Sequence, residues 1–125
     1  MTGNGGPLFR TEEDRAAETA RLNDLARTAP HRVNATWCMT QGVSALVAEA
    51  EPRGYELVQA IAGFSSFDAD NDPFGERDFG ALTLWGQRLF WKIDYLHPER
   101  DEHSPAKWSA ELTRRVLTVM LASEY

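Results

Sequence analysis

The chain has 125 residues, of which 13 are basic and 19 are acidic, so its formal net charge is −6. A chain of this length can bury one hydrophobic core but has no room for two, and no apolar run approaches the roughly 20 residues of a membrane-spanning helix. These properties exclude multidomain and membrane-spanning proteins. The acidic balance also argues against direct binding to nucleic acid or to an anionic membrane surface, which requires clustered Lys and Arg.

The start of the chain and its cysteine content indicate the compartment. Residues 1–9 lack the basic-then-apolar order of a secretory signal, and the one cysteine, Cys38, cannot form an internal disulfide. We therefore expect a protein of the reducing cytoplasm. The glycine-rich residues 1–10 are expected to be a disordered tail, followed by a single domain over residues 11–125.

The first elements after the tail are a helix and a strand. A helix is predicted over residues 11–28, because Thr11 is a suitable N-cap, acidic residues follow it in the first turn, and Pro30 prevents continuation. Residues 33–40 then alternate strictly between apolar and polar side chains. This pattern predicts a strand with one buried face.

The middle of the chain is helical in part. Residues 41–51 are alanine-rich and ambiguous, with a short helix as one reading. Pro52 begins a stronger helical pattern that ends at Gly63. We therefore predict a second helix over residues 52–63.

Two strands over residues 79–85 and 88–96 are predicted to form a hairpin. Gly86 and Gln87 provide a two-residue connection of the kind that joins antiparallel strands tightly. The resulting cross-strand pairs give one face that is mostly apolar. The predicted pairs are Leu84 with Leu89, Leu82 with Trp91, Gly80 with Ile93, Phe79 with Asp94, and Asp78 with Tyr95.

The last element is predicted to be a helix over residues 109–123. Ser109 is its expected N-cap, apolar residues recur at helical spacing, and Glu111 and Arg115 lie four residues apart on the exposed side. All these elements together predict an α+β fold. In it, a small antiparallel sheet of about three strands (33–40, 79–85, 88–96) packs against three helices (11–28, 52–63, 109–123).

The net negative charge is confined to two segments. Residues 68–78 carry a net charge of −4 and residues 94–102 a net charge of −3, whereas the rest of the chain carries +1. The first strand of a hairpin starts where its second strand ends, so we expect both segments to leave the same end of the sheet and to form one acidic patch. The predicted patch comprises Asp68, Asp70, Asp72, Glu76, Asp78, Asp94, Glu99, Asp101 and Glu102.

Two aromatic residues extend this candidate partner-binding surface. Trp85 and Phe90 are assigned to the same strand face as Arg88, Lys92 and Asp94. Aromatic rings interleaved with charge are typical of a protein interface, because Trp and Arg supply much of the binding energy there. The alternative is that the first helix covers this face and buries both rings.

Three segments resemble a family of small bacterial proteins of unknown function. They are the loop D-N-D-P-F-G-E-R-D-F-G (70–80), the strand R-L-F-W-K-I-D-Y (88–95) and the ending T-R-R-V-L-T-V-M-L-A-S-E-Y (113–125). The resemblance covers about residues 32–125 and implies association with plasmids and other mobile elements, with no assigned catalytic residue. This chain departs from the usual pattern in its more polar first strand and in the stretch between residues 96 and 107.

The first acidic segment also suggests a metal site. Asp68, Asp70 and Asp72 alternate as at the start of a calcium-binding loop, but Pro73 stands where such a loop needs glycine and Phe79 where it needs glutamate. Another carboxylate arrangement would suit Mg²⁺, Mn²⁺ or Ca²⁺. Its ligands would be Asp70, Asp72, Glu76 and Asp78. Alternatively, these side chains only form turns.

These features lead to two competing functional hypotheses. The first is a non-enzymatic binding protein without a cofactor, whose acidic patch engages the basic surface of a protein partner. The resemblance favours a nucleic-acid-binding component of a host defence system as that partner, which implies an anti-CRISPR or anti-restriction inhibitor. The second is a divalent-metal-dependent hydrolase in which Glu76 activates water. Homodimerisation through the aromatic sheet face is compatible with either hypothesis.

Overall fold

The computed structural model describes residues 11–125, so the predicted tail lies outside the described residues. The helices of this part of the chain are α1 (Glu12–Thr28), η2 (Pro30–Arg32), α2 (Gln41–Ala48), α3 (Arg53–Ala62) and η3 (Ala122–Glu124). The strands are β1 (Ala35–Met39), β2 (Phe79–Leu84), β3 (Gln87–Leu96) and β4 (Arg114–Leu121).

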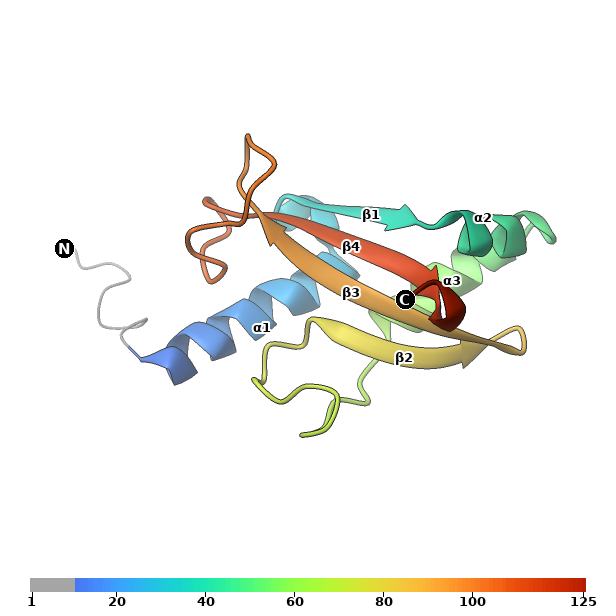
Figure 1. Cartoon of the computed structure of the whole chain (residues 1–125), viewed down its shortest axis with the longest axis horizontal. Coiled ribbons are helices and arrows are strands. Elements are labelled where there is room, and N and C mark those ends of the chain that lie inside the picture. Colours follow the sequence, from blue (N-terminus) through green and yellow to red (C-terminus); the bar gives the residue numbers. More distant parts are fainter. Residues whose placement is uncertain (1–10) are drawn as a thin grey trace.

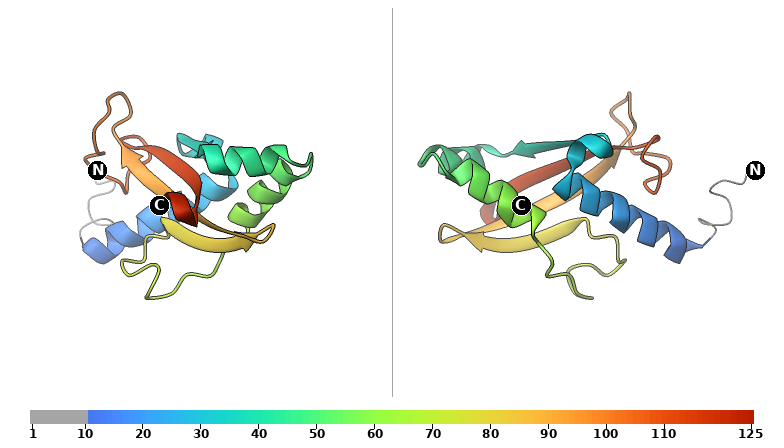
Figure 2. Two further views of the ribbon diagram at one scale, coloured as in Figure 1. Left: turned by 45° about the vertical axis from the view of Figure 1, so that its right-hand side comes forward. Right: turned by 180° about the vertical axis from the view of Figure 1, so that it is seen from behind.

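The strands form one mixed sheet in the order β1-β4-β3-β2, with β1 parallel to β4 and the other pairs antiparallel. Helices α1 and α3 lie on one face of this sheet, and within residues 11–125 the one helical segment on the opposite face is η3 near the C-terminus (Figures 1 and 2). The predicted α+β class is confirmed, although the sheet has four strands rather than three. None of the helices within residues 11–125 has the length and apolar character needed to cross a membrane.

The N-terminal half matches the predicted elements closely. The Thr11 side chain accepts a hydrogen bond from the Asp14 amide at 3.0 Å and caps α1 as predicted. The first strand begins at residue 35 rather than 33, because Asn34 has a φ of 53° and interrupts the extended backbone. The ambiguous segment after β1 is helical over the eight residues of α2, and Thr40 is its N-cap.

The hairpin is confirmed, but its predicted register is wrong by two residues. Trp85 and Gly86 both have positive φ angles, 54° and 73°, and they form the connection in place of residues 86–87. Positive φ at both central positions is the conformation of the tightest hairpin turns, and Trp is an unusual residue for it. A shift by two residues leaves the strand side chains on their predicted faces, whereas Trp85 moves from the predicted strand into the turn. The observed pairs include Leu84 with Gln87, Leu82 with Leu89, Gly80 with Trp91, and Phe79 with Lys92.

The predicted C-terminal helix over residues 109–123 is wrong, because residues 114–121 form β4 in the middle of the sheet. Arg115, Leu117 and Val119 alternate along β4 and are fully buried beneath the helices. The two-residue period is hidden in the sequence because a charged residue, Arg115, occupies one of the buried positions. Ser109 accepts a hydrogen bond from the Leu112 amide at 3.3 Å in the preceding loop.

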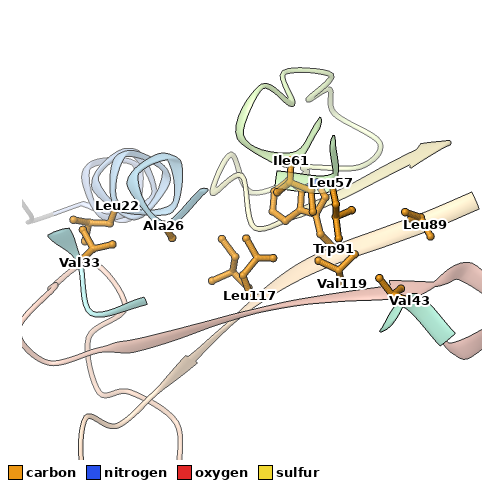
Figure 3. Close-up of a cluster of buried hydrophobic side chains, with 11 residues drawn as sticks. Leu22, Ala26, Val33, Val43, Leu57, Ile61, Leu89, Trp91, Leu117 and Val119 are labelled. Atoms are coloured by element: carbon orange, nitrogen blue, oxygen red, sulfur yellow. The ribbon is translucent and has the colours of Figure 1, made fainter. Parts of the chain in front are cut away.

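One hydrophobic core lies between the sheet and the helices (Figure 3). Trp91 at its centre is fully buried, and Phe64 and Phe67 meet its ring edge-on at centroid distances of 5.5 and 6.1 Å. The segment that follows α3 is therefore fixed beneath β3 before it enters the acidic loop. The labelled core residues are Leu22, Ala26, Val33, Val43, Leu57, Ile61, Leu89, Trp91, Leu117 and Val119.

Replacement of Gly80 tests this packing. A Cβ atom at Gly80 would collide with Trp91 Nε1 and would lie 2.6 Å from Trp91 Cε2 and 2.8 Å from Phe64 Cζ. Gly80→Ala is therefore expected to lower the free energy of unfolding by about 1–3 kcal/mol, measured by chemical denaturation. The control is Gly54→Ala in α3, where a Cβ meets only Val47 Cγ1 at 3.8 Å and should not destabilise. Equal stability of the two variants would contradict the close packing of Trp91 and Phe64 against Gly80.

Candidate functional site

A buried polar cluster connects α1, β3 and β4 at the end of the sheet where both acidic segments begin. Arg115 and Asn23 are fully buried, and Arg115 Nε donates to Asn23 Oδ1 at 2.8 Å. Arg115 also donates to the Lys107 carbonyl oxygen. Asn23 Nδ2 in turn donates to the Tyr95 hydroxyl at 2.8 Å and to the Glu76 carbonyl oxygen at 3.0 Å. This cluster fixes the bases of both loops.

Carboxylates from the first acidic segment complete the cluster. The Tyr95 hydroxyl lies 3.1 Å from Asp78 Oδ2 and 3.3 Å from Glu76 Oε1, and its single proton can be donated to one of them at a time. Lys107 Nζ lies 2.6 Å from Glu76 Oε2. The two loops therefore meet through opposite charges, and Glu76, which is buried, is not part of an exposed acidic surface.

Burial controls the ionisation of these groups. It raises the pKa of the Asp78 carboxyl, the hydrogen bond from Tyr95 opposes that rise, and the Glu76 charge adds to it. Burial and the Asp78 charge hold the pKa of the Tyr95 phenol well above its ordinary value. Burial also lowers the pKa of Arg115, whose buried Nη1 has no hydrogen-bond partner within the described part of the chain.

Residues 68–78, here called the Phe74 loop, are held by side chains that bond to their own backbone. Asp68 Oδ1 accepts from the amides of Asp70 at 2.8 Å and Asn71 at 3.0 Å. Asp72 Oδ1 accepts from the amides of Glu76 and Arg77, both at 3.0 Å. The alternative that these carboxylates form turns is thus observed for Asp68 and Asp72.

The Phe74 loop presents an aromatic side chain at its tip. Phe74 is 78% exposed, and the following Gly75 has a φ of 69°, which a residue with a side chain rarely adopts. Asp70 is also exposed, and its backbone is fixed by Asp68. Sequence reasoning overlooked Phe74, although the P-F-G tripeptide inside an acidic turn is a signal that could have identified it.

The second acidic segment does not join the first into one patch. Both loops leave the same end of the sheet, but in all views the tip of residues 68–78 lies below the sheet and the tip of residues 97–103 lies above it (Figures 1 and 2). The exposed carboxylates thus form two groups. In the second group, Glu102 pairs with Arg100 at 3.1 Å, Asp101 lies 3.6 Å from Arg114, and Glu99 is exposed.

The predicted strand pairing of these acids is also corrected. Asp94 pairs with Val116 of β4 rather than with Phe79, and its carboxylate lies 3.1 Å from Lys92 Nζ on the open sheet face. Asp78 is not a backbone partner of Tyr95, since the Asp78 carbonyl oxygen accepts from the Ile93 amide at 2.9 Å. The contact between Asp78 and Tyr95 is made by their side chains instead.

The two predicted aromatic residues lie in different places. Phe90 lies on the open sheet face, where its ring meets those of Phe79 and Tyr125 at a centroid distance of 5.3 Å in each case. The first helix covers the other face, so the alternative of burial beneath it is wrong for Phe90. Trp85 lies in the hairpin turn and donates from Nε1 to Glu56 of α3 at 2.8 Å. It therefore does not share a surface with Phe90.

Glu76 and Asp78, two of the four carboxylates predicted as metal ligands, come together at the Tyr95 hydroxyl. Asp72 is bonded to backbone amides, Glu76 to Lys107, and Asp78 to Tyr95, while Asp70 lies in the exposed turn. Over residues 11–125, no group of three or more His, Cys, Asp or Glu side chains is arranged to hold a metal ion.

Comparison with known proteins identifies a family. The family described as "Protein of unknown function (DUF3768)" matches residues 39–124, which is more than half of the chain. No curated protein and no solved structure matches the chain.

The half-buried Asp78 carboxyl predicts a pH-dependent stability. Its pKa in the folded protein exceeds that of the unfolded chain, so the folded state holds the extra proton and stability falls as pH rises through the folded pKa. Asp78→Asn removes this titration. The change that it makes in the free energy of unfolding should therefore be more favourable at pH 7 than at about pH 4. Chemical denaturation at both pH values measures this difference. The exposed Asp70→Asn is the control, and an equal effect of Asp78→Asn at both pH values would contradict the prediction.

Proposed function

We propose that this chain, which belongs to the DUF3768 family of proteins of unknown function, is a non-enzymatic binding domain that docks onto a basic surface of a partner protein. The Phe74 loop is its contact surface. The carrying observation is the exposure of Phe74 at the tip of a loop whose backbone is fixed by its own aspartates.

The loop is organised before any partner arrives. Four hydrogen bonds donated by backbone amides to Asp68 and Asp72 restrain it, and the Asn71 side chain donates another to the Ser66 carbonyl oxygen at 2.8 Å. Ordering a flexible loop on binding costs free energy, and this loop avoids most of that cost. An aromatic side chain presented in this way suits a hot-spot residue, which inserts into a pocket on the partner.

The charge of the loop defines the chemistry of the partner. Residues 68–78 carry a net charge of −4, and Asp68 and Asp70 are exposed. A positively charged partner surface would be attracted to this loop and would associate faster at low ionic strength. A phosphate-binding groove of a nucleic-acid-binding protein has the required charge. A component of a restriction or CRISPR complex is the partner of this class that the family resemblance favours.

The alternative of a metal-dependent hydrolase has less support in the geometry. Of its four expected ligands, three have other partners within the fold, namely Asp72, Glu76 and Asp78. The Glu76 carboxylate, assigned to water activation in that hypothesis, is buried against Lys107. The structure thus favours the binding hypothesis over the catalytic one.

Substitution of Phe74 tests the proposal. Phe74→Ser should leave the melting temperature nearly unchanged, because an exposed side chain contributes little to stability. The same change should reduce retention of the partner at least about tenfold, as expected for a hot-spot residue. The measurement is a pull-down from host lysate with quantitative mass spectrometry, comparing wild type and variant.

Matched charge variants provide the controls. Asp68→Asn with Asp70→Asn removes two charges from the Phe74 loop and keeps side-chain oxygens that can accept the turn hydrogen bonds. Glu12→Gln with Glu13→Gln removes two charges from the exposed start of α1. Of these two double variants, only Asp68→Asn with Asp70→Asn should weaken capture of the partner. The loss should be larger at low salt, where charges are screened less. Capture that survives both Phe74→Ser and this loop double variant would refute the proposal.

A further inference from the structure

A second surface of the molecule combines an open strand edge with an apolar groove. Two adjoining cavities, of about 290 and 380 Å³, lie between β1 and α3 and share Trp37 and Val58 in their walls. Met39, Val47 and Leu57 also line the first cavity, and Pro30 also lines the second. Met39 is 44% and Val58 45% exposed, so the groove leaves apolar side chains in contact with solvent.

Strand β1 is an outer strand of the sheet, and one of its edges has no partner strand in the described part of the chain (Figures 1 and 2). The Arg115 amide donates to the Asn34 carbonyl oxygen, and the Thr40 amide donates to the Val119 carbonyl oxygen, both at 3.0 Å. Since backbone groups alternate in direction along a parallel strand, the backbone amides and carbonyl groups of Thr36 and Cys38 also face β4. The amides and carbonyl groups of residues 35, 37 and 39 face outward.

We infer that the β1 edge and its groove form a binding site for a short extended segment of a partner protein, which adds to the sheet as a fifth strand. In this mode, backbone hydrogen bonds to the outward groups of β1 provide affinity, and pockets for alternate side chains provide specificity. Residues i and i+2 of a strand lie about 7 Å apart on the same face. Two apolar side chains at that spacing would enter the two cavities on either side of Trp37.

The size of the site favours a peptide segment over a second copy of this chain. The five residues of β1 extend for about 17 Å, which matches a short peptide segment, whereas a stable interface between two protein chains needs roughly 800 Å² per partner. A second copy pairing through its own β1 would have to offer Trp37 to the groove. Trp37 is already held by its own chain, because its Nε1 donates to the Ala26 carbonyl oxygen at 2.9 Å.

Charges at the two ends of the groove define the direction and composition of the segment. His31 and Arg32 are exposed just before β1, next to Pro30 of the second cavity, and Glu51 is exposed in the turn between α2 and α3, three residues before Gly54 of the first cavity. An antiparallel segment, the more stable arrangement, would place its N-terminal end near Glu51 and its C-terminal end near Arg32. The segment should therefore carry a basic residue before the two apolar ones and an acidic residue after them.

The experiment uses the full chain and the synthetic peptide K-T-L-T-V-T-E. Amide hydrogen exchange measured by NMR should show new protection at Ala35, Trp37 and Met39 when the peptide is added. Protection at Thr36 and Cys38, whose amides already face β4, should not change. The peptides E-T-L-T-V-T-K and K-T-S-T-S-T-E, which reverse the charges or remove the apolar side chains, should bind at least about tenfold more weakly.

Two substitutions on the exposed side of α3 distinguish the groove from a nonspecific surface. Val58→Arg should weaken binding of K-T-L-T-V-T-E at least about tenfold, because Val58 borders both cavities. The matched control is Tyr55→Arg on the same helix, at a residue that is 70% exposed, and it should leave binding unchanged. Phe74→Ser should also leave binding of the peptide unchanged, because the Phe74 loop is a separate site.

Three results would overturn the inference. The first is the absence of new protection at the three outward amides of the wild-type chain at millimolar peptide, a result that does not depend on any variant. The second is binding that Val58→Arg and Tyr55→Arg affect equally. The third is protection of the same amides in the protein alone that increases with concentration, together with a dimer in sedimentation, which would assign the edge to a second copy.

Discussion

The buried guanidinium of Arg115 links the sheet to α1 and to the loop that contains Lys107. It lies in the middle strand β4, bonds to Asn23 of α1, and donates to the carbonyl oxygen of Lys107 in the second loop. Through Asn23, the same network reaches Tyr95 and the Phe74 loop. A buried charge is costly unless its neighbours satisfy it, so this one residue constrains a helix, two strands and two loops at once.

This constraint separates a rigid support from an exposed surface. Glu76 and Asp78 bind inward to Lys107 and Tyr95 and hold the base of the Phe74 loop, whereas Phe74 itself lies in solvent. An acidic segment that looks uniform in sequence therefore has two roles. Glu76 and Asp78 at its base are structural, whereas the exposed Asp68 and Asp70 can attract a partner.

The second proposed site depends on the opposite edge of the sheet. Because β4 occupies the centre, β1 becomes an outer strand with α3 beneath it, and the groove is the space left between them. The Phe74 loop belongs to the segment that leads into β2, at the other edge, so the two surfaces can engage different partners or different parts of one partner.

Local sequence patterns are sufficient to predict the α1 cap at Thr11, α3, both strands of the hairpin and the faces of their strand side chains. These follow from periodicity and turn chemistry, which act over a few residues. The strand over residues 114–121 could not be predicted from local patterns, because burial of Arg115 depends on Asn23 of α1, 92 residues away in the chain. The tertiary structure also decided that the acidic residues form two groups rather than one, since the direction of each loop is fixed by long-range contacts such as the pairing of Glu76 with Lys107.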